Sequence, residues 1–92
     1  MKSIAPSIAL LALGLAACDD RPKHWNAYVY PDFEGSEEYE TIAGFKSLEY
    51  CRWTATKRIE QLRQPEKADY ECGYMCRYDP QMQINVCKET KK

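Results

Sequence analysis

Five cysteines in a chain of 92 residues are the feature that most constrains its fold. Cys51, Cys72, Cys76 and Cys87 lie in the second half of the chain, and Cys18 stands near the N-terminus. An odd count leaves one cysteine without a partner in the same chain, whereas small exported domains commonly depend on disulfides because their cores are small. We therefore expect two disulfides among the four later cysteines, each adding roughly 2 to 4 kcal/mol to the free energy of unfolding.

The length of a strand limits how these four cysteines can pair. If residues 70–78 form a strand, Cys72 and Cys76 lie about 13 Å apart at 3.3 Å per residue, beyond the Cα separation of about 7 Å that a disulfide spans. Cys51 should then pair with one of these two cysteines and Cys87 with the other. Of the two assignments, we favour Cys51 with Cys72 and Cys76 with Cys87.

The N-terminal segment has the pattern of an export signal. Lys2 gives a positive start, residues 8–15 form a short apolar run, and Ala16 and Ala17 supply the small residues that precede a cleavage site. The run is shorter than the approximately 20 apolar residues that a membrane-spanning helix needs. We therefore expect residues 1–17 to be a signal peptide.

The tetrapeptide Leu15-Ala16-Ala17-Cys18 resembles the lipobox of small bacterial membrane lipoproteins of unassigned function. The resemblance covers residues 1–19 and implies that Cys18 becomes the lipid anchor, with diacylglycerol on its sulfur and an acyl chain such as palmitate on the new N-terminus. Several acyl chains give stable attachment, at about 0.8 kcal/mol per buried CH₂ group. Asp19 resembles a retention signal, which implies the periplasmic face of the inner membrane rather than the outer membrane.

Two other interpretations of this segment stay open, an ordinary signal peptide cut near Ala17 and an uncleaved signal anchor. In the lipoprotein interpretation, residues 18–24 form a tether and residues 25–92 form one domain. An extended chain of about five residues holds such a domain within roughly 20 Å of the lipid surface. Any partner is then expected at the membrane or in the adjacent periplasm.

The pattern after the tether predicts an α+β domain, in which one helix packs on a face of a small antiparallel sheet of three to four strands. Residues 25–30 are rich in strand formers and end at a Pro-Asp turn, and residues 39–43 predict a short second strand. Residues 70–78 and 82–88 predict a hairpin that turns through residues 79–81. In a regular strand, Cys72 and Cys76 share one face, and Cys87 points away from the face of Val86. A bulge near Gly73 or a disulfide on the other side of the sheet would reconcile these directions.

A helix is predicted over residues 48–63. Ser47 suits the N-cap, and Pro65 marks the far end. Apolar residues recur at spacings of three and four and should face the sheet; they are Leu48, Cys51, Ala55, Ile59 and Leu62. Trp53 lies beside this stripe and should close one edge of the core.

The composition excludes several classes of function. The 13 Lys and Arg nearly balance the 14 Asp and Glu, so no strongly basic field suggests nucleic acid. His24 is the single histidine and lies in the expected tether, and the sequence shows no Ser-His or Cys-His pair, phosphate-binding loop or C-x2-C zinc spacing. We therefore expect a non-enzymatic protein without a cofactor, in which the acidic residues 34–40 form a solvated loop.

The C-x3-C segment from Cys72 to Cys76 leaves one different function open. Such a segment can bind copper or perform thiol-redox chemistry in the periplasm, with Met75 and His24 as possible further ligands. Because Cys51 and Cys87 are available as disulfide partners, structural disulfides are the preferred interpretation, with no metal site.

The aromatic residues are the remaining candidates for a binding surface. Two Trp, seven Tyr and two Phe are too many for one small core to cover, so some must be exposed. Tyr28 and Tyr30, together with Trp53 and the hairpin residue Tyr74, are the possible binding surface for a protein or a glycan. In the simpler interpretation, the tyrosines only border a thin core. We expect a membrane-anchored periplasmic lipoprotein that binds or supports an envelope protein, with an inhibitor of an envelope-attacking enzyme such as lysozyme as the alternative.

Overall fold

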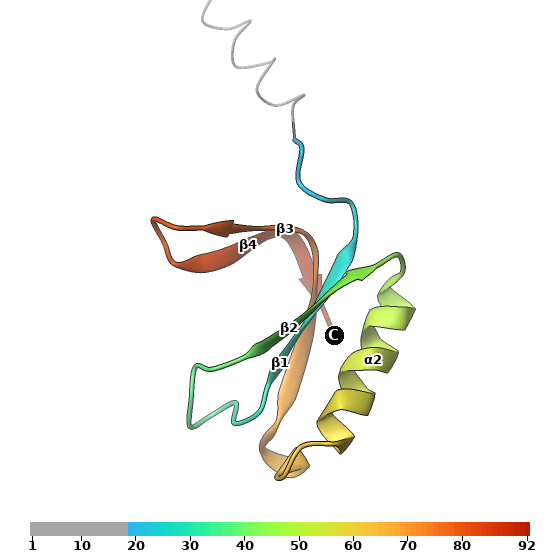
Figure 1. Cartoon of the computed structure of the whole chain (residues 1–92), viewed down its shortest axis with the longest axis vertical. Helices are drawn as coiled ribbons and strands as arrows, with labels where there is room; N and C mark the ends of the chain where they lie inside the picture. Colours follow the sequence, from blue (N-terminus) through green and yellow to red (C-terminus); the bar gives the residue numbers. More distant parts are fainter. Residues whose placement is uncertain (1–18) are drawn as a thin grey trace, which may run out of the picture.

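The computed structural model describes residues 19–92 and shows one helix against a four-stranded antiparallel sheet (Figure 1). The strand order is β2-β1-β3-β4. The elements are β1 (Trp25–Tyr30), β2 (Glu40–Phe45), α2 (Leu48–Glu60), the 3-10 helix η1 (Pro65–Lys67), β3 (Asp69–Asp79) and β4 (Ile84–Lys91). The predicted α+β class is therefore confirmed. The expected signal peptide 1–17 and the lipidation site Cys18 lie outside the described residues.

The helix α2 begins where the sequence predicts and ends earlier. The backbone N–H of Tyr50 donates to the Ser47 side-chain oxygen at 3.1 Å, so Ser47 caps the first turn. After Glu60, the N–H groups of Gln61 and Leu62 donate to carbonyls three residues back, each at 3.0 Å. This tighter turn ends the helix three residues before the expected end at residue 63 and leads into η1.

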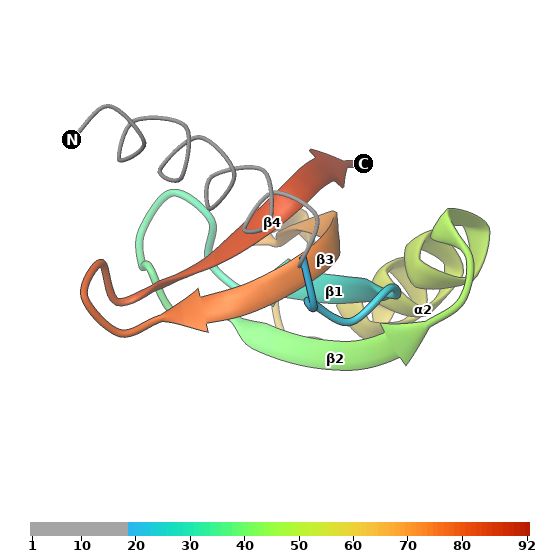
Figure 2. The same cartoon turned by 90° about the horizontal axis from the view of Figure 1, so that it is seen from above.

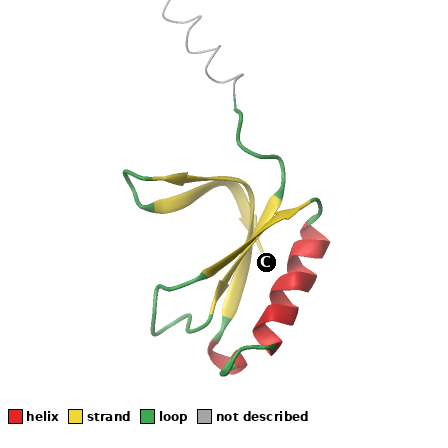
Figure 3. Cartoon of the chain, in the orientation of Figure 1, coloured by secondary structure: helices red, strands yellow, loops and turns green. Residues whose placement is uncertain are grey.

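The core lies between α2 and the covered face of the sheet (Figure 3). Its fully buried residues are Ala27, Val29, Cys51, Ala55 and Cys72, and the partly buried residues around them include Leu48, Ile59 and Leu62. The predicted apolar stripe of the helix therefore faces the sheet. Trp53 does not close the core edge as expected, because 58% of its surface is exposed. It lies two positions after Cys51, which turns its side chain away from the sheet.

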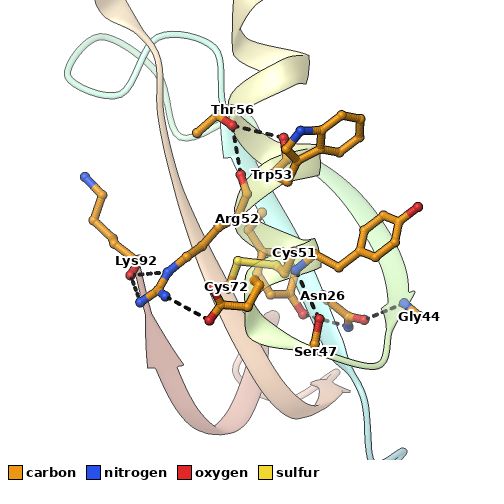
Figure 4. Close-up of a disulfide and its surroundings, with 12 residues drawn as sticks. Asn26, Gly44, Ser47, Cys51, Arg52, Trp53, Thr56, Cys72 and Lys92 are labelled. Carbon is orange, nitrogen blue, oxygen red and sulfur yellow. Dashed lines mark hydrogen bonds and ion pairs between the residues drawn. A yellow bond between two sulfur atoms is a disulfide. The ribbon is translucent and has the colours of Figure 1, made fainter.

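Both predicted disulfides form, and they fasten different pairs of elements. Cys51–Cys72 joins α2 to β3 inside the core (Figure 4). Cys76–Cys87 joins β3 to β4 at directly opposite positions of the antiparallel ladder. The first disulfide therefore holds the helix on the sheet, and the second holds the hairpin together.

The strand β3 changes its alternation at Met75, whose φ of 53° lies in the left-handed region. A Cβ atom on Gly73 would lie 2.7 Å from Cys76 Sγ and 2.5 Å from Cys87 Sγ, so this disulfide lies on the Gly73 face. Cys72 faces the helix instead. The expectation that Cys72 and Cys76 share a face is therefore wrong. The disulfide lies on the other side of the sheet, and the irregularity is at Met75 rather than at Gly73.

Beyond Met75 the β3–β4 hairpin curves away from the side that α2 covers (Figure 1, Figure 2). The twisted sheet therefore has one face that α2 covers and one concave face, from which the hairpin and the loop of residues 31–39 project (Figure 1, Figure 2). Within residues 19–92, no helix has the length and apolar character needed to cross a membrane.

Candidate functional site

An open pocket of about 570 Å³ lies on the sheet face opposite α2. Three parts of the chain form it: the sheet itself, the loop of residues 31–39 and the hairpin around its turn. The lining residues are Tyr28, Tyr30, Phe33, Ser36, Glu37, Tyr39, Glu71, Gln83, Ile84, Asn85, Cys87 and Thr90. A pocket of this volume falls within the range of small-ligand sites.

The floor of the pocket follows from the alternation of β1. Ala27 and Val29 face the helix, so Tyr28 and Tyr30 face the other side. Tyr28 is only 4% exposed, and its hydroxyl accepts a hydrogen bond of 3.2 Å from the Asn26 side-chain amide. Burial raises the pKa of Tyr28, so this phenol stays neutral.

Four rings surround the pocket, and we call Tyr28, Tyr30, Phe33 and Tyr39 the aromatic group. The ring centre of Tyr39 lies 5.9 Å from that of Tyr28 and 5.8 Å from that of Tyr30. Tyr30 also makes an edge contact with Phe33 at 5.7 Å. Phe33 and Tyr39 are 55% and 43% exposed, so the group presents ring surface to solvent at the pocket rim.

Polar side chains of the pocket form hydrogen bonds with the hydroxyl groups of these rings. The Tyr30 hydroxyl donates to Glu71 Oε1 at 2.8 Å, and the Asn85 side-chain amide donates to the Tyr39 hydroxyl at 2.9 Å. Burial, and after it the hydrogen bond to Glu71, raises the pKa of Tyr30 far above the usual value for a phenol. The Tyr30 hydroxyl therefore keeps its proton and donates a hydrogen bond to Glu71 throughout the physiological pH range.

The charges that line the pocket are all negative. Glu37 and Glu71 are its two charged residues, and no Lys or Arg is among the lining residues. No ion pair found within residues 19–92 involves either carboxylate. The pocket is therefore an aromatic site whose charged lining residues are both acidic and lie outside the ion pairs of residues 19–92.

Hydrogen bonds from backbone N–H groups fix the two projecting parts. In the loop, the Asp32 side chain accepts from the Gly35 N–H at 3.1 Å, and the Phe33 N–H donates to the Lys67 carbonyl at 3.0 Å. In the hairpin, the Gln83 N–H donates to the Asp79 carbonyl at 2.7 Å. Together with the disulfide of Cys87, these contacts hold both walls relative to the sheet.

Two of the four predicted binding residues line this pocket, and the other two lie elsewhere. Tyr28 and Tyr30 form the floor. Tyr74 packs on the ring of Trp25, with centroids 5.0 Å apart. Trp53 lies on the outer side of α2 beside Tyr50, at 6.1 Å between ring centres. The predicted residues therefore do not form one surface.

Sequence reasoning missed the residues that the register and the hairpin bend bring to the pocket. Glu71 pairs with Tyr28 across β1 and β3, so strand alternation places it on the pocket face once the register is known. Asn85 is missed for a different reason, because it reaches Tyr39 only through the bend that follows Met75. The run of acidic residues gave no sign that Glu37 would lie beside aromatic rings.

The C-x3-C segment is divided between the two disulfides. Cys72 and Cys76 belong to different bridges and lie on opposite faces of β3. Met75 is buried, and its N–H donates to the His24 carbonyl at 3.2 Å. Within residues 19–92, no three His, Cys, Asp or Glu side chains are grouped as a metal site requires.

Comparison of the chain with protein-family models, with curated proteins and with solved structures found no match.

Proposed function

We propose that this chain is a lipid-anchored, non-enzymatic periplasmic protein that binds an envelope protein through the pocket beside Tyr30. The observation that carries the proposal is the aromatic group, in which Tyr28 and Tyr30 lie on β1 and the exposed Phe33 and Tyr39 project from the loop of residues 31–39. Tyrosine and phenylalanine are enriched at recognition surfaces because they offer large apolar area at a low entropic cost. The pocket's hydroxyl and amide groups supply hydrogen bonds at the same place.

The anchor in this proposal is Cys18, supported by its lipobox-like surroundings. The first described residues bind back to the domain, since Asp20 pairs with Arg77 of β3, and the His24 carbonyl accepts from Met75. Asp19 makes two hydrogen bonds of 2.9 and 2.8 Å with the Arg21 side chain, which hold its pKa far below the usual range. The position of Asp19 directly after Cys18, which resembles a retention signal, supports the proposed inner-membrane location, and the contacts of Asp20 and His24 hold the tether against the domain.

Mass spectrometry of the full chain expressed in a diderm bacterium tests the anchor. The expected product begins at Cys18, carries the mass of a diacylglyceryl group and an acyl chain, and is found in the membrane fraction. The matched control is Cys18→Ser, which should leave the membrane fraction. A wild-type product with an unmodified Cys18 thiol, or one that retains residues 1–17, would contradict the lipoprotein assignment.

Photo-crosslinking from single positions of the lipidated chain tests partner binding. A photoreactive side chain in place of Tyr39 at the pocket rim should give a discrete adduct with an envelope protein. The same group in place of Lys57, on the solvent side of α2, is the matched control and should give none. Adducts of equal yield from both positions, or none from Tyr39, would overturn the proposal.

A direct assay separates partner binding from the inhibitor alternative. In the proposed function, lysozyme keeps its lytic activity at a stoichiometric excess of the chain. Inhibition that is lost when Tyr39 is replaced would assign the pocket to an envelope-attacking enzyme instead, and would overturn the proposal.

A further inference from the structure

We propose that the pocket is a cation-recognition site that takes the ammonium or guanidinium group of a Lys or Arg side chain presented by the partner protein. This inference rests on the proposed function and names the chemistry by which the partner is recognised. Three properties of the pocket carry it: its rings, its charge and its neutral hydrogen-bonding groups.

The rings form the kind of surface that attracts a cation. The face of an aromatic ring carries a negative potential and attracts a cation that lies within about 6 Å of the ring centre. Tyr39 packs on Tyr28 and Tyr30 at 5.9 and 5.8 Å between ring centres, and Tyr30 packs on Phe33 at 5.7 Å, so the rings form one continuous aromatic surface on which a cation can lie. Phe33 and Tyr39 are the exposed members through which a side chain would enter.

The charge of the pocket has the sign that such a ligand requires. Glu37 and Glu71 line it without a basic neighbour in the lining. The Tyr30 hydroxyl donates a hydrogen bond to Glu71 Oε1, whereas Glu71 Oε2 has no hydrogen-bond partner among residues 19–92. A ligand cation can therefore pair with Oε2 without displacing the bond that orients the carboxylate. The same field repels phosphate and carboxylate ligands.

The neutral side chains of the hairpin complete the site. Asn85 already donates to the Tyr39 hydroxyl, and Gln83 stands beside it at the turn. Side-chain amides at the rim can bond the peptide groups that flank an inserted side chain. The volume of about 570 Å³ exceeds what one Lys or Arg side chain needs, so part of its backbone also fits.

Titration of the lipidated chain in neutral detergent micelles with small capped amino acids tests the inference. The probes are Nα-acetyl-lysine methylamide and Nα-acetyl-arginine methylamide, and the matched control is Nα-acetyl-norleucine methylamide, which has a similar apolar stem and no charge. We expect saturable NMR shift changes at Tyr30, Tyr39 and Asn85 with both cationic probes, and weaker binding as salt is added, because salt screens partly exposed charges. The norleucine probe should cause no saturable change.

Two variants with matched controls locate the binding. Glu71→Gln removes the charge but keeps an acceptor for Tyr30, and Tyr39→Leu removes one exposed ring. Each should weaken binding of the cationic probes roughly fivefold, the factor that corresponds to about 1 kcal/mol. Glu49→Gln and Tyr50→Leu alter an exposed carboxylate and an exposed ring on α2, and should leave the affinity unchanged. Unchanged shifts in the core report that each variant is folded.

Several outcomes would overturn the inference. The norleucine probe could bind as well as the cationic probes, or neither cationic probe could cause a saturable change. The affinity for the cationic probes could be unchanged in both pocket variants, or neutral chitotriose could bind at the pocket and the cationic probes not. The result is separable from the proposed function. Crosslinking at Tyr39 without cation binding would support partner binding and refute cation recognition. Cation binding without a crosslinked envelope protein would support cation recognition and refute partner binding.

Discussion

Cys72 and Cys76 project from opposite faces of β3 although only three residues separate them. Cys72 reaches the helix on the covered face, and Cys76 bonds Cys87 on the pocket face. The positive φ of Met75 between them makes this possible, because it breaks the alternation of side chains along the strand. One local backbone conformation therefore lets two disulfides close together in sequence fasten two different parts of the fold.

Replacement of Gly73 with alanine should destabilise the protein through the second disulfide. A Cβ atom there would meet Cys87 Sγ at 2.5 Å, Cys76 Sγ at 2.7 Å and the Tyr28 ring at 3.0 Å, so we expect a loss of roughly 1 to 3 kcal/mol, as for overpacked cores. In a Cys76→Ala, Cys87→Ala background the same change should cost clearly less, because both sulfurs are gone. Urea unfolding of the four proteins as a double-mutant cycle measures the difference; equal costs in both backgrounds would contradict the close approach.

The two disulfides should contribute unequally to stability. Their sequence separations are 21 for Cys51–Cys72 and 11 for Cys76–Cys87, for which loop-closure entropy gives about 3.4 and about 2.8 kcal/mol. Cys51 and Cys72 are also fully buried, so their replacement by alanine leaves space in the core. Urea unfolding of the two double alanine variants should show the larger loss for the Cys51–Cys72 pair. A larger loss for the hairpin pair would contradict the placement of the core.

The sequence was sufficient to predict the main helix and the four strands, although not where each of them ends. The strand of residues 25–30, the Ser47 cap and the apolar stripe of the helix depend on local pattern, and each is found in the structure. Strand geometry excluded a bond between Cys72 and Cys76 and left two assignments, of which the favoured one forms. The conformation of Met75 was not predictable, since methionine rarely adopts a positive φ.

The pocket was only half predictable for a related reason. Tyr28 and Tyr30 were among the predicted binding residues, and alternation along β1 places them on the face away from α2. The walls come from the loop that holds Phe33 and from the bent hairpin that holds Asn85, and neither follows from local periodicity. Trp53 was expected at the core edge because it lies beside the apolar stripe of the helix. The stripe does not determine the direction of this side chain, and the structure places it in solvent.

Trp53→Ala should therefore have little effect on stability. Trp53 is 58% exposed, and exposed substitutions usually change the free energy of unfolding by less than about 0.5 kcal/mol. Trp25→Ala is the matched change, since Trp25 packs on the core and on Tyr74, and it should cost roughly 2 to 4 kcal/mol. Thermal unfolding followed by circular dichroism compares the two variants. A similar loss of stability in both variants would show that Trp53 packs in the core.

The ion pair between Arg58 and Glu40 should make stability depend on pH in the acidic range. Arg58 Nε and Nη2 donate to the two Glu40 oxygens at 2.8 and 2.9 Å and so link α2 to β2. These bonds lower the pKa of Glu40 from its ordinary value of 4.5. The stabilisation is then present above pH 4.5 and is lost as the pH falls through the lower pKa of the folded state. Glu40→Gln should unfold at lower urea concentration than wild type at pH 7 and match it near pH 2, and a constant difference across this range would contradict the pair.

The pocket tyrosines should make stability depend on pH in the alkaline range. The pKa values of Tyr28 and Tyr30 are raised above the ordinary 10.0, mainly by burial, so these phenols stay neutral in the folded state while the unfolded chain ionises. Stability is therefore complete below pH 10 and declines as the pH rises above it. Tyr30→Phe removes one such group and should shift alkaline unfolding to higher pH, whereas Tyr50→Phe, at an exposed site on α2, should not. Absorbance at the phenolate band, recorded with circular dichroism, measures both events, and identical alkaline transitions in the two variants would show that Tyr30 ionises freely in the pocket.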